Sequence, residues 1–134
     1  MPGIRTLPDR EFLQAFKAMD RIIQNNAPLF VMVWAGGLVL LAAAVFMNAG
    51  ALEGLLKLLL IGAGMVYLVG FQLPTFMVNV PLNNQLQAVD LNAPEAHLEH
   101  IRAVFEPRWV FWNSFRTVVG TVTTLALLLI IYFI

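Results

Sequence analysis

Three long apolar runs constrain the fold of this chain more than any other feature of its sequence. They cover residues 29–47, 54–80 and 115–134, and the first holds 19 residues without a charge. As an α-helix it would be about 28 Å long, close to the roughly 30 Å hydrocarbon thickness of a bilayer. A chain in lipid must satisfy its backbone hydrogen bonds internally, so runs of this length predict membrane-spanning helices. With 60% hydrophobic and 12% charged residues, the composition favours one all-α membrane domain over residues 1–134.

An amphipathic helix is expected before the first run, over about residues 8–25. Phe12, Phe16, Met19 and Ile23 recur there at helical spacing, and charged residues fill the other faces. Such a helix either lies on the membrane surface or packs against the spanning helices. The expected fold is therefore a helical membrane bundle with three spanning helices and one amphipathic helix.

Prolines divide the rest of the chain. Pro74 and Pro81 are expected to interrupt the far end of the second run, because proline lacks the N–H that a helix needs. Residues 82–114 form a polar connection that predicts a helix of its own, closed by Pro107. The third spanning helix then begins near Phe115.

The basic residues predict how the chain crosses the membrane. Lys57 alone lies beside the short turn between the first two runs. The other seven precede the first run or lie between the second and third, or just inside the third: Arg5, Arg10, Lys17, Arg21, Arg102, Arg108 and Arg116. By the positive-inside rule, the N-terminus and the 82–114 connection are cytoplasmic and the C-terminus is outside, in a plasma (inner) membrane. A net charge of zero gives no indication of nucleic-acid binding.

Two polar stripes mark the cytoplasmic ends of the second and third runs. They share a helical spacing and comprise Gln72, Thr75, Asn79 and Asn83 on one run, and Asn113, Thr117, Gly120 and Thr124 on the other. Trp109 and Arg116 extend the second stripe. The two stripes are expected to face each other, with Asn83 in contact with Asn113 or Arg116.

The stripes allow two interpretations. Asn, Thr and Gly commonly hold spanning helices together, which makes the cluster structural. Alternatively, the cluster is a pocket in which a flat ligand stacks on Trp109 and Trp112 while polar side chains bind its oxygens. For both tryptophans an interfacial aromatic belt, and for Arg116 an interfacial anchor, are the simpler alternatives.

A metal site has little support. His97 and His100 are one helical turn apart, but no third ligand follows at a useful spacing, and a zinc site needs at least three. A solvated helix face is the expected environment of both histidines. The sequence has no cysteine, which excludes thiolate ligands and disulfides.

Two sequence boxes resemble those of the anthrone-oxygenase-like integral membrane family. One is Pro-Leu-Asn at residues 81–83, within Asn-Val-Pro-Leu-Asn-Asn-Gln-Leu, and the other is Trp109, Asn113 and Arg116 within Trp-Val-Phe-Trp-Asn-Ser-Phe-Arg-Thr. The Met-Pro-Gly start and Ile-Ile-Gln-Asn-Asn at residues 22–26 also resemble the family, so the resemblance covers nearly the whole chain. It implies a four-helix bundle of which this chain lacks the first span, because Met1 stands where relatives continue from that span. A reading frame that begins upstream, or a truncated member, is expected.

The resemblance also implies a chemistry. The family's named activity is oxidation of an anthrone to an anthraquinone with dioxygen and no added cofactor. It implies catalytic roles for Asn83, Asn113 and Arg116, which would stabilise an enolate. Substrate-binding roles fall to Gln72, Asn79, Trp109 and Trp112.

The proton-abstracting base is missing from this set. Many relatives carry His at the position of Ser114. The expected function is thus a cofactor-independent oxygenase on a lipophilic aromatic small molecule. The alternative is a non-enzymatic membrane protein that binds a ligand or partner, with the Asn, Arg and Trp cluster as structural glue. The sequence leaves the oligomeric state open.

Overall fold

The computed structural model describes residues 3–24, 28–48 and 50–133, and every regular element among them is a helix. The elements are α1 (Asp9–Gln24), α2 (Pro28–Asn48), α3 (Gly54–Val66), the π-helical segments η1 (Tyr67–Gln72) and η2 (Thr75–Asn79), α4 (Val80–Gln87) and α5 (Glu95–Phe133). From α3 to α4 the chain is one continuous helical run.

Three helical runs are long and apolar enough to cross a membrane. They are Pro28–Asn48, Gly54–Gln87 and Glu95–Phe133. Most of their large apolar side chains are exposed on the isolated chain, as expected for surfaces that face lipid. The predicted fold, an all-α bundle with three spanning helices and an amphipathic helix, is confirmed.

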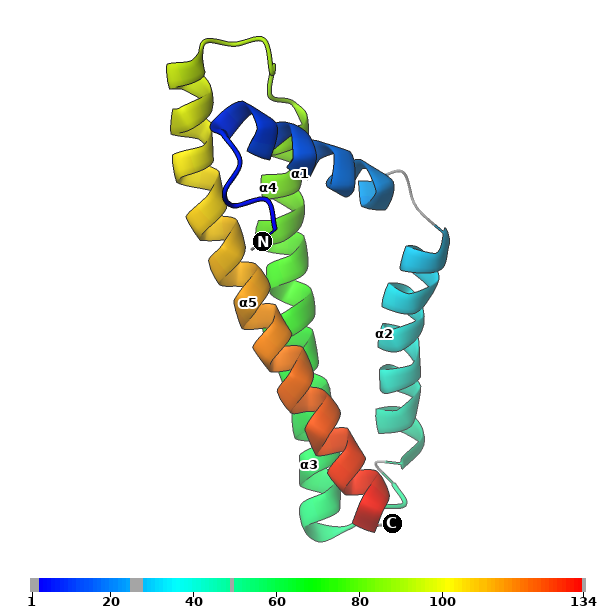
Figure 1. Cartoon of the computed structure of the whole chain (residues 1–134). Coiled ribbons are helices and arrows are strands. Elements are labelled where there is room, and N and C mark those ends of the chain that lie inside the picture. Colours follow the sequence, from blue (N-terminus) through cyan, green and yellow to red (C-terminus); the bar gives the residue numbers. More distant parts are fainter. Residues whose placement is uncertain (1–2, 25–27, 49, 134) are drawn as a thin grey trace.

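The helices meet in a simple arrangement (Figure 1). The α3–α4 run and α5 lie side by side and antiparallel, and α2 packs mainly on α3. Helix α1 lies across the end of this pair, where α4 ends and α5 begins. The turn between α2 and α3 and the last turn of α5 lie at the opposite end. The N-terminal helix and the α4–α5 loop therefore share one end of the molecule, as the predicted topology requires.

The second run stays helical through both of its prolines. The Leu73 N–H bonds to the Leu68 carbonyl directly before Pro74, and the Val80 N–H bonds to the Thr75 carbonyl directly before Pro81. Each bond spans five residues and widens the turn, which relieves the clash between a proline ring and the carbonyl four residues earlier. The predicted interruption is thus a pair of π segments, and the helix reaches Gln87 instead of ending near residue 80.

The predicted break at Pro107 is wrong. Helix α5 runs without interruption from Glu95 to Phe133, with Pro107 inside it. Its 39 residues span about 58 Å, so it projects well beyond the roughly 30 Å apolar core. Phe105 and Trp109, on either side of the proline, both contact Phe16 of α1. This packing holds both halves of α5 against α1 and so opposes the helix break that an interior proline, at a cost of roughly 3 kcal/mol, favours.

The best-buried apolar core lies under α1 rather than inside the spanning part. It joins α1, α4 and α5 through Phe12, Leu13, Phe16, Leu82, Leu86, Leu98 and Phe105. The amphipathic helix therefore packs on the bundle, which decides between the two placements expected for it. Met19 and Ile23, which share the predicted stripe, are 47% and 43% exposed, because the last turns of α1 extend past the helix pair.

Basic side chains fasten this end of the molecule. Arg102 pairs with Glu106 at 2.8 Å and with Asp9 at 3.0 Å, and it also donates to the carbonyls of Arg5 and Leu7, both at 2.7 Å. On α1, Arg10 and Lys17 donate to carbonyls of the α4–α5 loop. Arg10, Lys17 and Arg102 thus bind acceptors within the protein itself.

Close packing between η1 and α5 gives a first prediction. A Cβ added to Gly70 would lie 3.0 Å from Val119 Cγ1, whereas one added to Gly62 would meet nothing within 4 Å. We expect Gly70→Leu to lower the free energy of unfolding by about 1–3 kcal/mol through overpacking, and Gly62→Leu to have little effect. Unfolding by sodium dodecyl sulfate in mixed micelles, followed by circular dichroism, measures both. Equal stability of the two variants would contradict the η1–α5 contact.

Candidate functional site

A buried carboxylate on α1 binds side chains of α4 and of α1 itself. Asp20 is 4% exposed, and its Oδ1 accepts a hydrogen bond from Asn83 Nδ2 at 2.7 Å. Its Oδ2 accepts from Gln87 Nε2 at 2.8 Å and from Gln24 Nε2 at 3.0 Å. We call Asp20, Gln24, Asn83, Gln87 and Trp109 the carboxylate network. Among the described residues Asp20 has no cationic partner, so neutral amides alone hold its charge.

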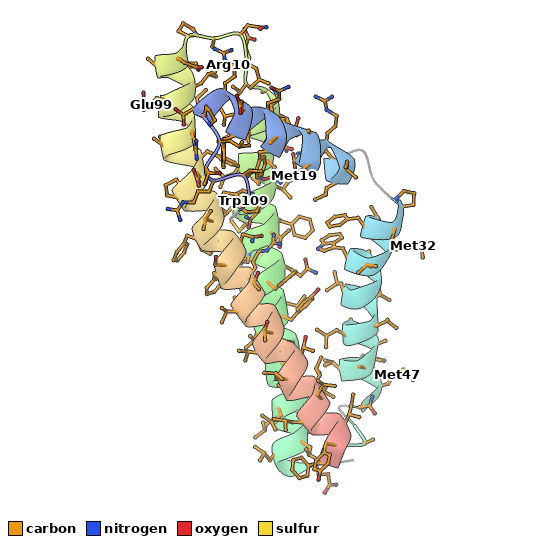
Figure 2. All side chains as sticks on the ribbon, in the orientation of Figure 1. Arg10, Met19, Met32, Met47, Glu99 and Trp109 are labelled. Atoms are coloured by element: carbon orange, nitrogen blue, oxygen red, sulfur yellow. The ribbon has the colours of Figure 1, made fainter. Side chains whose placement is uncertain are left out.

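Trp109 connects this network to the aromatic core. Its indole Nε1 donates to Asn83 Oδ1 at 2.8 Å. Its ring meets Phe16 edge-on at 5.3 Å, and Phe16 meets Phe105 edge-on at 4.8 Å. Figure 2 shows Trp109 beneath α1, at the junction with α4 and α5. The indole is therefore held both by a hydrogen bond and by ring contacts.

The hydrogen-bond partners of Asn83 differ from the predicted ones. The two stripes do meet, but Asn83 pairs with Asp20 and Trp109, and none of its hydrogen bonds goes to Asn113 or Arg116. The physical reason is the register of the antiparallel pair, which brings Asn83 level with Trp109. Arg116 lies two helical turns further along α5.

A second group of polar side chains lies further along the spanning helices and has buried atoms without a hydrogen-bond partner. Gln72 Oε1, both side-chain polar atoms of Asn79, and Arg116 Nε are buried without a hydrogen bond. Gln72 and Asn79 are each 4% exposed. Trp34 Nε1 on α2 and Thr123 Oγ1 on α5 are likewise buried without a hydrogen-bond partner. We call Gln72, Asn79 and Arg116 the inner polar group.

The surroundings of Arg116 are aromatic. Its guanidinium lies 5.0 Å from the centroid of the Phe71 ring, and Phe71 stacks on Tyr67 at 5.0 Å. The Tyr67 hydroxyl accepts a hydrogen bond from Gln72 Nε2 at 3.0 Å. No ion pair of the described residues includes Arg116. A cation–π contact replaces a counter-ion here.

The helix register places Arg116 between the levels of Gln72 and Asn79, which lie about two helical turns apart. Asn83 lies against Trp109, and Phe71 lies against Gly120. Between these two levels, Arg116 falls opposite the segment that separates Gln72 from Asn79. Both amides are contributed by the π segments, since Gln72 ends η1 and Asn79 ends η2.

The remaining candidate residues make fewer contacts. Trp112 is partly buried, and its ring lies edge-on to those of its α5 neighbours Phe111, at 5.5 Å, and Phe115, at 5.7 Å. Asn113 is partly buried, and no hydrogen bond joins its side chain to the carboxylate network. Ser114 is exposed.

The apolar grooves of the described structure lie away from the inner polar group. An apolar groove of about 300 Å³ runs between α2 and α3, and one of about 290 Å³ runs between α4 and α5 beside His100 and Arg108. Residues of the inner polar group line neither.

Within the part of the chain that the structure describes, no three His, Asp or Glu side chains gather as metal ligands, so His97 and His100 have no third partner.

Asp20 is the residue that sequence reasoning missed. It shares a helix face with Phe12, Leu13 and Phe16, the other buried residues of α1. A carboxylate on an apolar stripe was a signal available in the sequence, because buried charges are rare unless they are paired.

The fold and these polar groups define an integral membrane protein with a polar cluster inside its spanning helices. The family model for anthrone oxygenase matches residues 16–126, which is most of the chain. The protein belongs to the anthrone oxygenase family, as its sequence boxes indicated. No match was found among curated proteins or among solved structures.

The carboxylate network gives a second prediction. Asn83→Leu removes a donor to Asp20 and the acceptor of Trp109, and it leaves buried polar atoms unpaired. We expect the free energy of unfolding to fall by about 2–3 kcal/mol. Gln85→Leu, at an exposed position of the same helix, is the control and should change it little. Unfolding in mixed micelles measures both variants, and an equally stable Asn83→Leu variant would show that the network does not stabilise the fold.

Proposed function

We propose that the protein is a cofactor-independent oxygenase acting on a lipophilic aromatic small molecule that binds at the inner polar group. The observation that carries this proposal is the set of buried, unpartnered atoms of Gln72, Asn79 and Arg116. The family's activity supplies the reaction class. Asn113, Trp109 and Trp112 are included as further contacts of the ligand.

The energetic argument concerns the cost of these atoms. A buried polar group without a partner costs about 1–3 kcal/mol, and a charged one costs more. Polar side chains within a membrane usually pair with one another or serve function. Asn79, with neither amide atom bonded, and Arg116, with no carboxylate partner, do not pair here. A ligand with anionic and carbonyl oxygens would provide the missing partners.

The chemistry follows from the same charges. In the oxidation of an anthrone, the ring methylene loses two hydrogens and becomes a ketone, while dioxygen supplies the new oxygen and leaves its second atom as water. Loss of the first methylene proton gives an enolate. Arg116, with the amides of Asn79 and Asn113, would stabilise this anion more than the neutral substrate, which is what lowers a barrier. Trp109 and Trp112 would form the walls against which the flat rings stack.

Asn83 supports the non-enzymatic alternative as well. Its side chain is bonded on both sides within the carboxylate network. A residue satisfied in this way stabilises helix packing, so its catalytic role in the proposal is indirect. A membrane protein that binds a lipophilic ligand without turnover uses the same inner polar group, and a turnover assay separates the two functions.

Topology forms part of the proposal. We propose a plasma (inner) membrane location, with α1 and the α4–α5 loop in the cytoplasm and the C-terminus outside. The positive-inside distribution supports this orientation. It would place the carboxylate network at the cytoplasmic surface and the inner polar group about two helical turns below it.

Replacing Arg116 tests the binding site. We expect Arg116→Gln to weaken binding of a hydroxylated anthrone by about 10- to 150-fold, because charge-assisted hydrogen bonds contribute about 1.5–3 kcal/mol. Oxygen consumption with the same anthrone should fall in parallel. Arg108→Gln, which removes a charge from an exposed position of α5, is the control.

The outcomes distinguish the candidate functions. Binding and oxygen uptake by the parent protein that are lost in Arg116→Gln support the oxygenase. Binding without oxygen uptake supports the non-enzymatic alternative. Equal effects of Arg116→Gln and Arg108→Gln would contradict a site at the inner polar group.

Single cysteines test the topology. The chain has no cysteine, so Ala51→Cys and Ala96→Cys each provide one label site in otherwise unchanged protein. Both positions are exposed, in the α2–α3 turn and at the start of α5. In right-side-out vesicles, we expect an impermeant maleimide to label the Ala51→Cys variant but not the Ala96→Cys variant. The reverse labelling pattern would contradict the proposed orientation.

A further inference from the structure

Burial of the Asp20 carboxylate carries a desolvation cost that an apolar residue would not have. Its hydrogen bonds to Asn83, Gln87 and Gln24 offset that cost and also constrain the side chains that donate them. The hydrogen bonds of Asp20 show which side chains it orients.

Asp20 determines the orientation of the Asn83 amide. An ionised carboxylate only accepts hydrogen bonds, so Asn83 must present its Nδ2 to Asp20. Its Oδ1 then points toward Trp109, whose indole N–H only donates. The chain Asp20–Asn83–Trp109 thus has one consistent order of donors and acceptors. Without a carboxylate at position 20, only the hydrogen bond from Trp109 would hold the Asn83 amide in this orientation.

The amide oxygen of Asn83 in turn fixes the Trp109 ring. The hydrogen bond holds the indole nitrogen, and the perpendicular contact with Phe16, at an interplanar angle of 84°, holds the ring face. Trp109 lies one helical turn from Asn113 and two from Arg116. Its ring therefore lies at the cytoplasmic end of the proposed ligand site.

We propose that Asp20 is a positioning residue: through Asn83 it fixes the indole of Trp109 as the aromatic wall of the ligand site. Gln24 and Gln87 hold the second carboxylate oxygen, so that the first remains aimed at Asn83. The part of this proposal that concerns the ligand rests on the proposed function. The part that concerns the Trp109 ring does not.

A single-tryptophan protein tests the positioning directly. The chain has three tryptophans, so Trp34→Phe with Trp112→Phe leaves Trp109 as the only one. In this background, we expect Asp20→Asn to lower the fluorescence anisotropy of Trp109 and to raise its quenching by acrylamide about twofold or more, while circular dichroism stays unchanged. Glu99→Gln, an exposed acid on α5, is the matched control and should leave both signals as they are.

Exchanging the carboxylate and the amide between positions 20 and 83 tests whether the Trp109 signals can be restored. In the double variant Asp20→Asn with Asn83→Asp, the new carboxylate at position 83 accepts from Trp109 and from the new amide at position 20. The oxygen of that amide accepts from Gln24 and Gln87, so the order of donors and acceptors is restored. We expect the Trp109 signals to return toward those of the parent. Should Asp20→Asn fail to fold, the folded double variant with parental Trp109 signals provides the same support.

Ligand binding separates this proposal from the proposed function. With all three tryptophans present, we expect Asp20→Asn to bind a hydroxylated anthrone about tenfold less tightly and the double variant to recover. A parental Trp109 signal in Asp20→Asn, or a double variant that folds with the signal still altered, would overturn the positioning role. Altered Trp109 signals with no anthrone binding by the parent would overturn the proposed function and leave the positioning role standing.

Discussion

The hydrogen bonds of the Asp20 carboxylate join α1 to α4 beside the aromatic contacts that join α1 to α5. One oxygen accepts from Asn83 and the other from Gln24 and Gln87, so a charge removed from water keeps strong partners. The apolar core of α1 surrounds this junction, and Phe16 packs against Phe105 and Trp109 on the two sides of Pro107. The unbroken α5, the docking of α1 and the orientation of Trp109 all depend on this junction.

The π segments have a comparable role within the spanning part. They accommodate Pro74 and Pro81 without ending the helix, and each ends on a buried amide, Gln72 or Asn79. π-Helical turns often occur at functional sites, because the widened turn changes which side chains face the neighbouring helix. Here the register with α5 places Arg116 between the levels of the two amides. The side chains of the carboxylate network pair with one another, whereas the inner polar group keeps buried atoms without a hydrogen-bond partner. This difference is the basis for proposing ligand binding at the inner polar group.

Particular residues show how far sequence reasoning reached. Hydrophobic periodicity predicted the three spans and the amphipathic helix, because burial in lipid leaves an uncharged run few alternatives to a helix. It failed at Pro107, where local propensity favours a helix end but packing of the neighbouring aromatic side chains on α1 keeps the helix intact. The stripes containing Asn83 and Asn113 were predicted to face each other. The pairing of Asn83 with Asp20 and Trp109 was missed, since it involves a residue 63 positions away in sequence.

The sequence by itself determined the class of protein: the number of spanning helices, the amphipathic helix and the family to which the chain belongs. These properties follow from composition, from periodicity and from short motifs, which are local. Only the tertiary structure decided which polar side chains are paired. That outcome depends on the register of two antiparallel helices, and the close contacts of Gly70 with Val119 and of Gly120 with Phe71 accompany that register. Packing between two helices depends on side chains from both, so no single segment determines the register. Which polar side chains find a partner is therefore decided only when the helices pack together.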